Sequence, residues 1–271
     1  MKGNLIFGGF AAAVAGVVLL ASQFSQYNIP TKSFDQLREA SVMIKTDHGS
    51  CSGTLIEDPF KDDGIQTTIL TAAHCGVVGD TVTIKEWSLI GNRKILGETI
   101  EFKAVARSTE TDVMIFQSDS PALLPSVPIY GGTVSFGDRI FISGYGQGLP
   151  QDLTFGYAGF IEESCPFVRR MGWSSCDFLR VSNFISPGNS GSGVWKETEE
   201  GYVLVGVVSN GYISRFETSS RFSYAVTIDN LRSFIEKIRQ NGLDPQPTKE
   251  EIEESHQDLI DRLTDIETEN G

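Results

Sequence analysis

Short apolar and β-branched runs, separated by turn residues, dominate the middle of the chain. Runs of this length that end in turn residues are typical of β-strands. They cover residues 40–46, 67–74, 81–87, 99–106, 112–117, 139–146, 202–209 and 222–227. Helical spacing of apolar residues is convincing only over residues 228–240, and Gly242 follows closely as a stop signal. The pattern therefore predicts an all-β protein that closes with one C-terminal helix.

A proline-rich stretch divides this β pattern into two halves. Residues 121–128 contain Pro121, Pro125 and Pro128. Proline lacks the N–H that a central strand needs for its hydrogen-bond ladder. We therefore expect a crossover here, between a first half of about residues 34–120 and a second half of about residues 129–227.

Composition narrows the function classes. Hydrophobic residues make up 40% of the 271 residues and charged residues 21%, values that are ordinary for a globular protein. The formal net charge is −13. Proteins that bind nucleic acid through its phosphates carry a basic surface, so this charge argues against a nucleic-acid partner.

The N-terminal segment, residues 1–22, has the pattern of a targeting sequence. Lys2 precedes an uncharged apolar run over residues 5–21. The run is long for the core of a signal peptide and short for a membrane-spanning helix, so both alternatives stay open. Either one predicts an exported protein, periplasmic or secreted, which is attached to the membrane if the segment is retained.

The C-terminal segment, residues 245–271, is an acidic tail. From Thr248 to Gly271, nine Asp and Glu residues accompany one lysine and one arginine. Thr248 and Glu251 form a capping-box pattern ahead of a short amphipathic stretch. The tail is either a short helix onto which a partner docks or a solvated, partly frayed segment.

Four cysteines fit export into an oxidising compartment. They are Cys51, Cys75, Cys165 and Cys176. Sequential pairing, Cys51 with Cys75 and Cys165 with Cys176, is the simplest of three possible arrangements. No C-x-x-C spacing occurs and the chain has only three histidines, so we expect no metal site and no cofactor.

Three polar residues stand in contexts that suit nucleophilic catalysis. Ser190 lies among small residues in PGNSGSG, where the backbone can turn sharply, although an ordinary loop has the same composition. His74 ends an apolar strand and precedes Cys75. Asp112 stands at the start of the apolar run VMIF, where its carboxylate could fix the tautomer of a histidine. The alternatives are that His74 has only a structural role and that Asp112 only caps a strand.

Taken together, these motifs resemble the trypsin-like (chymotrypsin-fold) serine proteases. The motifs SGTLI, TAAHC, DVMIF, PGNSGSG and GVVSNG follow one another in that family's order, and the likeness covers residues 34–240. PGNSG and FSYAVTIDNL look closer to the bacterial HtrA-like and glutamyl-endopeptidase-like branches than to digestive trypsins. The resemblance implies two packed six-stranded antiparallel β-barrels, one for each half of the chain, with the active site between them.

The resemblance also implies roles for single residues. His74, Asp112 and Ser190 would form the catalytic triad of a serine endopeptidase acting on a peptide or protein substrate. The N–H groups of Gly188 and Ser190 would form the oxyanion hole. Substrate-binding positions would be Ser209 and Gly211, along the substrate backbone, and Phe184 and Phe222, in a shallow, uncharged specificity pocket.

One departure from digestive trypsins concerns activation. Asn189 stands where their zymogens carry an aspartate that pairs with a newly cut N-terminus, and no IVGG-like start precedes the first strand. An uncharged amide cannot form that ion pair. We therefore expect a protease that needs no such cleavage to become active.

Other function classes fit less well. An esterase with an α/β fold would carry G-x-S-x-G and a triad in the order Ser, Asp, His, and the chain has neither. A structural surface protein with the barrels as spacers would not need these three residues. The remaining alternative is an exported binding protein that keeps the protease fold as a catalytically silent scaffold.

Overall fold

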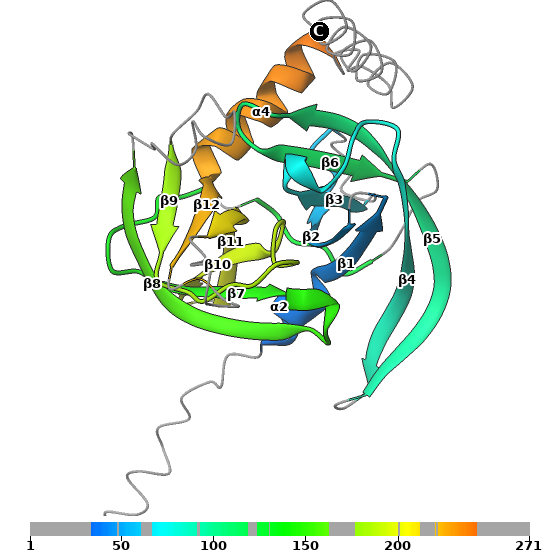
Figure 1. Cartoon of the computed structure of the whole chain (residues 1–271), viewed down its shortest axis with the longest axis horizontal. Helices are drawn as coiled ribbons and strands as arrows, with labels where there is room; N and C mark the ends of the chain where they lie inside the picture. The colour runs from blue at the N-terminus through cyan, green and yellow to red at the C-terminus, as the bar shows by residue number, and fades with distance from the viewer. Residues whose placement is uncertain are drawn as a thin grey trace, which may run out of the picture. The chain divides into compact units, whose positions relative to one another are not determined.

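The computed structural model describes two groups of β-strands joined by residues 124–129 (Figure 1). The described residues are 34–47, 49–60, 67–90, 93–118, 124–129, 131–162, 177–199, 201–211, 220 and 222–242. Strands β1–β6 come from the first half of the chain and strands β7–β12 from the second. The structure thus has the two β halves that the sequence predicts.

The first six strands form one antiparallel sheet that curls into a barrel. The strands are β1 (Ser41–Thr46), β2 (Gly49–Glu57), β3 (Thr67–Thr71), β4 (Thr81–Ile90), β5 (Arg93–Ser108) and β6 (Val113–Gln117). Their order in the sheet is β1-β2-β3-β6-β5-β4, and the end strands β1 and β4 lie against each other. Apolar side chains that include Ile44, Leu55, Phe102 and Phe116 fill its interior.

The last six strands form a closed barrel with the order β10-β11-β12-β9-β8-β7. They are β7 (Arg139–Gly144), β8 (Asp152–Glu162), β9 (Phe178–Val181), β10 (Gly193–Thr198), β11 (Gly201–Gly211) and β12 (Ser223–Thr227). Its interior contains Ile140, Val181, Val194 and Val208. The prediction of an all-β, chymotrypsin-like fold with two six-stranded barrels is therefore confirmed.

A third apolar cluster joins the two barrels and the C-terminal helix. Helix α4 (Ile228–Asn241) is capped at its N-terminus by Thr227, whose side chain accepts a hydrogen bond from the Asn230 N–H. Its buried face contributes Leu231, Phe234, Ile235 and Ile238. These side chains pack in the same cluster as barrel residues such as Ile115 and Trp195. The predicted helix is confirmed, and it helps to hold the barrels together.

Several elements were not predicted from the periodicity. Strands β2, β8, β9 and β10 were missed, as was the short helix α2 (Asp35–Glu39). Strand β8 exposes Phe155, Tyr157 and Phe160, so its apolar residues do not mark a buried face. Strands β2 and β10 contain small and polar residues that read as turns. Their pairing partners, and not their own composition, make them strands.

Some predictions lie outside the described residues. These are the N-terminal segment 1–22 with its apolar run 5–21, the cysteines Cys165 and Cys176, and the acidic tail 245–271. Within the described part of the chain, no helix has the length and apolar character needed to cross a membrane.

Candidate active site

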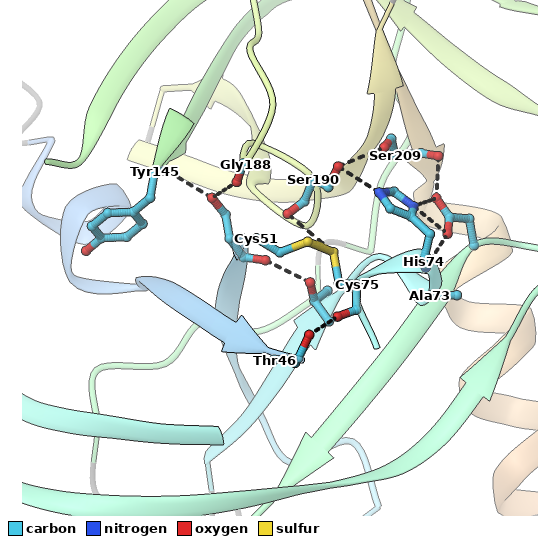
Figure 2. Close-up of a disulfide and its surroundings, with 12 residues drawn as sticks. Thr46, Cys51, Ala73, His74, Cys75, Tyr145, Gly188, Ser190 and Ser209 are labelled. Carbon is cyan, nitrogen blue, oxygen red and sulfur yellow. Dashed lines mark hydrogen bonds and ion pairs between the residues drawn. A yellow bond between two sulfur atoms is a disulfide. The ribbon is translucent and has the colours of Figure 1, made fainter. Parts of the chain in front are cut away.

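His74 lies in a short 3-10 turn, η1 (Ala73–Cys75), that directly follows strand β3. Two contacts fix this turn. Cys75 forms a disulfide with Cys51 of strand β2, as expected for sequential pairing (Figure 2). From strand β5, the Arg107 Nε–H donates to the Ala73 carbonyl at 2.9 Å. The backbone on both sides of His74 is thereby attached to neighbouring strands.

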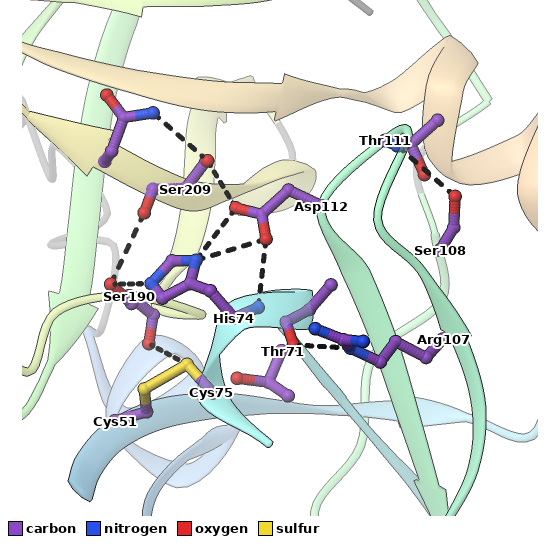
Figure 3. Close-up of polar contacts among 12 residues, drawn as sticks. Cys51, Thr71, His74, Cys75, Arg107, Ser108, Thr111, Asp112, Ser190 and Ser209 are labelled. Atoms are coloured by element: carbon purple, nitrogen blue, oxygen red, sulfur yellow. Dashed lines mark hydrogen bonds and ion pairs between the residues drawn. A yellow bond between two sulfur atoms is a disulfide. The ribbon is translucent and has the colours of Figure 1, made fainter. Parts of the chain in front are cut away.

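Asp112 lies at the entrance to strand β6, with its carboxylate directed at His74 (Figure 3). Its φ of 54° is in the left-handed region, which Asp tolerates better than most residues. Both carboxylate oxygens lie 3.1 Å from His74 Nδ1, and one also accepts the His74 backbone N–H at 3.1 Å. The carboxylate is fully buried, whereas the His74 side chain is 37% exposed and accessible to a substrate.

Ser190 comes from the second barrel and meets His74 across the junction. Its Oγ lies 2.8 Å from His74 Nε2. The following residue, Gly191, has a φ of 82°, and a Cβ there would lie 2.1 Å from both Ser52 O and Thr71 Oγ1. Only glycine fits this position, because any side chain would collide with the first barrel. The glycine thus allows the Ser190 loop to approach the strand that leads to His74.

The peptide groups around Ser190 are oriented by hydrogen bonds to their carbonyls. The carbonyl before Gly188 accepts the Gln147 N–H at 2.5 Å, and the carbonyl before Ser190 accepts the Ser192 N–H at 2.9 Å. In a trans peptide the N–H points away from the C=O. The N–H groups of Gly188 and Ser190 therefore point the other way, and neither donates to an acceptor within the described part of the chain.

Asn189, between these two donors, is buried and held within the second barrel. Its Oδ1 accepts the Ser186 N–H at 2.9 Å and the Ser186 hydroxyl at 3.2 Å. Its side chain also forms a hydrogen bond with Asp152. The neutral amide thus has partners at both ends, as a buried polar group requires.

The predicted substrate-binding residues occupy different environments. The Ser209 carbonyl lies 3.3 Å from Ser190 Oγ, at the site itself. Gly211 pairs with Ser223 in the neighbouring strand. Phe184 is 59% exposed, and Phe222 lies under the Arg180 guanidinium, whose Cζ is 4.4 Å from the ring centroid. Their roles toward a substrate stay predictions.

Sequence reasoning missed three contacts at this site. The Ser209 hydroxyl donates to the Asp112 carboxylate, a contact separate from any role of its backbone. The Ser52 hydroxyl bonds to the Gly188 carbonyl at 2.8 Å, and Arg107 bonds to the turn before His74. The only feature of the sequence that points to a role for Ser52 is its position next to Cys51. No feature of the sequence points to the contact of Arg107.

Cys51, His74 and Cys75 bring potential metal-ligating atoms together. Both sulfurs are used in the disulfide, however, and a disulfide sulfur is not the thiolate that zinc binds. His74 in turn faces Ser190 and Asp112. The cluster is therefore explained by the disulfide and does not form a metal site.

Comparisons with known proteins agree with this geometry. Residues 51–207 match the model of the trypsin-like peptidase domain. A search of the curated proteins returned no match. Among solved structures, the HtrA-type protease AlgW with a tripeptide has a TM-score of 0.58 at 18% identity over 78% of this chain and 65% of its own. This chain thus spans less than two thirds of AlgW.

Two further structures share the fold. A serine endoprotease from Yersinia pestis has a TM-score of 0.55 at 21% identity, covering 78% of this chain and 68% of its own. The inactive form of the protease Rv3671c, from M. tuberculosis H37Rv, has a TM-score of 0.54 at 18% identity. The likeness covers 76% of this chain and 91% of Rv3671c. With the match over residues 51–207, the chain belongs to the trypsin-like peptidase family.

Proposed function

We propose that the chain is an endopeptidase that cleaves peptide bonds through an acyl-enzyme on Ser190. The observation that carries this proposal is the hydrogen-bonded series from Ser190 Oγ to His74 Nε2, at 2.8 Å, and from His74 Nδ1 to Asp112, at 3.1 Å. A nucleophile, a base and a group that orients the base are the parts that this chemistry needs.

In the first step, the Ser190 oxygen attacks the substrate carbonyl carbon while His74 Nε2 takes the hydroxyl proton. The imidazolium then gives this proton to the leaving amine as the C–N bond breaks. A water molecule then attacks the acyl carbon while His74 takes one of its protons, and His74 gives this proton to the Ser190 oxygen as the ester bond breaks and the acid product leaves. Asp112 holds the imidazole in the required tautomer and stabilises the imidazolium, since its buried carboxylate lies against Nδ1.

The negative charge that develops on the substrate oxygen needs donors that are already in place. We assign this role to the N–H groups of Gly188 and Ser190, which the neighbouring carbonyl contacts turn away from internal acceptors. One donor of this kind contributes about 3 kcal/mol to transition-state stabilisation. The bound species is a peptide, the class of ligand that AlgW holds in its tripeptide complex.

We further propose that activity does not depend on a newly cut N-terminus. Asn189 carries no charge, and its side chain bonds to Ser186 and Asp152. A terminal ammonium group is therefore not needed to compensate a buried carboxylate at this position.

Labelling with a fluorophosphonate tests the proposal. The chain from Gln23 onward is refolded with its disulfides and treated with the reagent, which modifies only activated serines. Intact mass and peptide mapping then identify the site. We expect stoichiometric labelling at Ser190, with His74→Ala and Ser190→Ala as controls that do not react. Labelling of this chain without further cleavage at its N-terminus would support the activation proposal.

The competing function is a catalytically silent scaffold that acts as an exported binding protein. Folded protein that takes up no label and cleaves no peptide would favour this alternative. It would also show that the hydrogen-bonded geometry does not suffice to activate Ser190.

A further inference from the structure

Ser52, on strand β2 of the first barrel, directs its hydroxyl into the loop that carries Ser190. The side chain is fully buried. Its Oγ donates to the Gly188 carbonyl at 2.8 Å and accepts the Tyr145 backbone N–H at 2.8 Å. Because a backbone N–H can only donate, the hydroxyl proton is left for the Gly188 carbonyl. Figure 2 shows Tyr145 and Gly188 on the same side of the Cys51–Cys75 disulfide.

The backbone of Ser52 also forms hydrogen bonds in this region. Its N–H donates to the Ser190 carbonyl at 2.8 Å, and its own carbonyl accepts the Thr71 hydroxyl at 2.7 Å. Ser52 thus contacts the loop on both sides of Asn189, once through its backbone and once through its side chain. The preceding residue, Cys51, is joined to Cys75 next to His74.

Gly188 is a point in this loop where the backbone can rotate easily. Its φ is 99°, and glycine has no Cβ to restrict rotation of the peptide groups on either side. The Gly188 carbonyl belongs to the peptide that Gly188 shares with Asn189, and this peptide lies between the two that carry the N–H groups of Gly188 and Ser190. A displacement of this middle peptide would move both donors away from the oxyanion. The hydrogen bond from Ser52 holds it in place.

We infer that Ser52 is a positioning residue whose hydroxyl fixes the Gly188–Asn189 peptide and thereby the placement of the two oxyanion donors on either side of it, the N–H groups of Gly188 and Ser190. The inference rests on the proposed function, because it assumes that Ser190 is the nucleophile. The Ser52 hydroxyl touches neither substrate nor reacting atoms and acts on the loop through the Gly188 carbonyl. The geometry predicts that its loss affects the transition state, in which the oxyanion exists, much more than substrate binding in the ground state.

Ser52→Ala is the test, with Ser41→Ala as a matched control. Ser41 is also a fully buried serine at the contact between the barrels, but its hydroxyl bonds to Leu37 O at 2.7 Å and to Ser143, not to the Ser190 loop. Both variants lose one buried hydroxyl, so a general loss of packing or stability affects both. Thermal unfolding, kcat and KM for a peptide substrate are measured for wild type and both variants.

We expect Ser52→Ala to lower kcat by roughly 10- to 100-fold with KM within about twofold, somewhat less than the effect of removing a donor itself. Ser41→Ala should keep the wild-type kcat. A folded Ser52→Ala protein with wild-type kcat would overturn the inference while leaving the triad intact. A variant that fails to fold would also contradict it, because the hydroxyl would then serve the fold. A wild-type protein without activity would instead refute the proposed function.

Discussion

The Ser209 hydroxyl donates a hydrogen bond to the Asp112 carboxylate, and this contact joins strand β11 of the second barrel to a buried charge of the first (Figure 3). The other donors to Asp112, the backbone N–H and Nδ1 of His74, belong to the first barrel. The carboxylate therefore has its full set of hydrogen-bond donors only when both barrels are folded and packed together. A buried carboxylate without such donors is costly.

We predict that Ser209→Ala lowers kcat/KM by roughly tenfold, because a hydrogen bond to a charged group contributes about 1.5–3 kcal/mol and two donors remain. Steady-state kinetics on a peptide substrate measure the effect. Ser223→Ala is the control, since this buried serine of strand β12 donates to Asn183 O, away from Asp112. Equal kinetics for both variants would show that the Ser209 hydroxyl does not support Asp112.

The glycine after Ser190 should be intolerant of substitution. Gly191→Ala places a Cβ 2.1 Å from Ser52 O. We therefore expect the free energy of unfolding to fall by several kcal/mol and the activity to be lost. Gly79→Ala is the matched control: its φ of 94° is similar, but no atom lies within 4 Å of the added Cβ. It should cost only about 1–2 kcal/mol. Chemical denaturation that gave equal losses would mean that the collision is relieved by movement of the loop.

Loss of the Cys51–Cys75 disulfide should destabilise the protein. Removing a cross-link between residues 24 positions apart costs about 3 kcal/mol on the chain-entropy model. The double variant Cys51→Ala/Cys75→Ala should therefore unfold at a lower urea concentration. Its kcat should also fall, because the disulfide holds the turn that carries His74. An unchanged urea midpoint would show that packing alone fixes this turn.

Tyr145 should make stability fall at alkaline pH. Burial raises the pKa of Tyr145 to about 12, whereas a tyrosine in an unfolded chain titrates near pH 10. The folded protein therefore keeps this proton where the unfolded chain has lost it. The contribution is fully present below about pH 10 and disappears as the pH rises toward about 12.

Tyr145→Phe should remove this alkaline loss, on the order of 2 kcal/mol relative to wild type. Thermal unfolding between pH 9 and 11 measures the difference. Tyr157→Phe, a change at an exposed tyrosine of strand β8, should behave like wild type. A Tyr145→Phe protein that lost stability as steeply as wild type would show that other groups cause the effect.

The parts of the fold that the sequence predicts are those with a local signal. Strand β6, the helix α4 and the motifs around His74, Asp112 and Ser190 carry apolar periodicity or an unusual local composition. Strands β2 and β10 lack that signal and become strands only through their neighbours. Composition alone could not separate them from turns.

The supporting contacts of the site depend on long-range geometry. Ser52 and Gly188 are 136 positions apart, and their hydrogen bond depends on the direction of one carbonyl. Ser209 is 97 positions from Asp112. No local pattern encodes such pairs, because a serine in a strand reads the same whether or not its hydroxyl meets a partner.

The division of the site between the barrels has a consequence for newly made chains. His74 and Asp112 come from the first barrel and Ser190 from the second, and Ser52 joins the two. On the proposed mechanism, a chain that has folded only its first half carries a base without a nucleophile. Such a partly folded chain therefore cannot cleave its neighbours, and the ability to cut arises only once both barrels are folded and packed together.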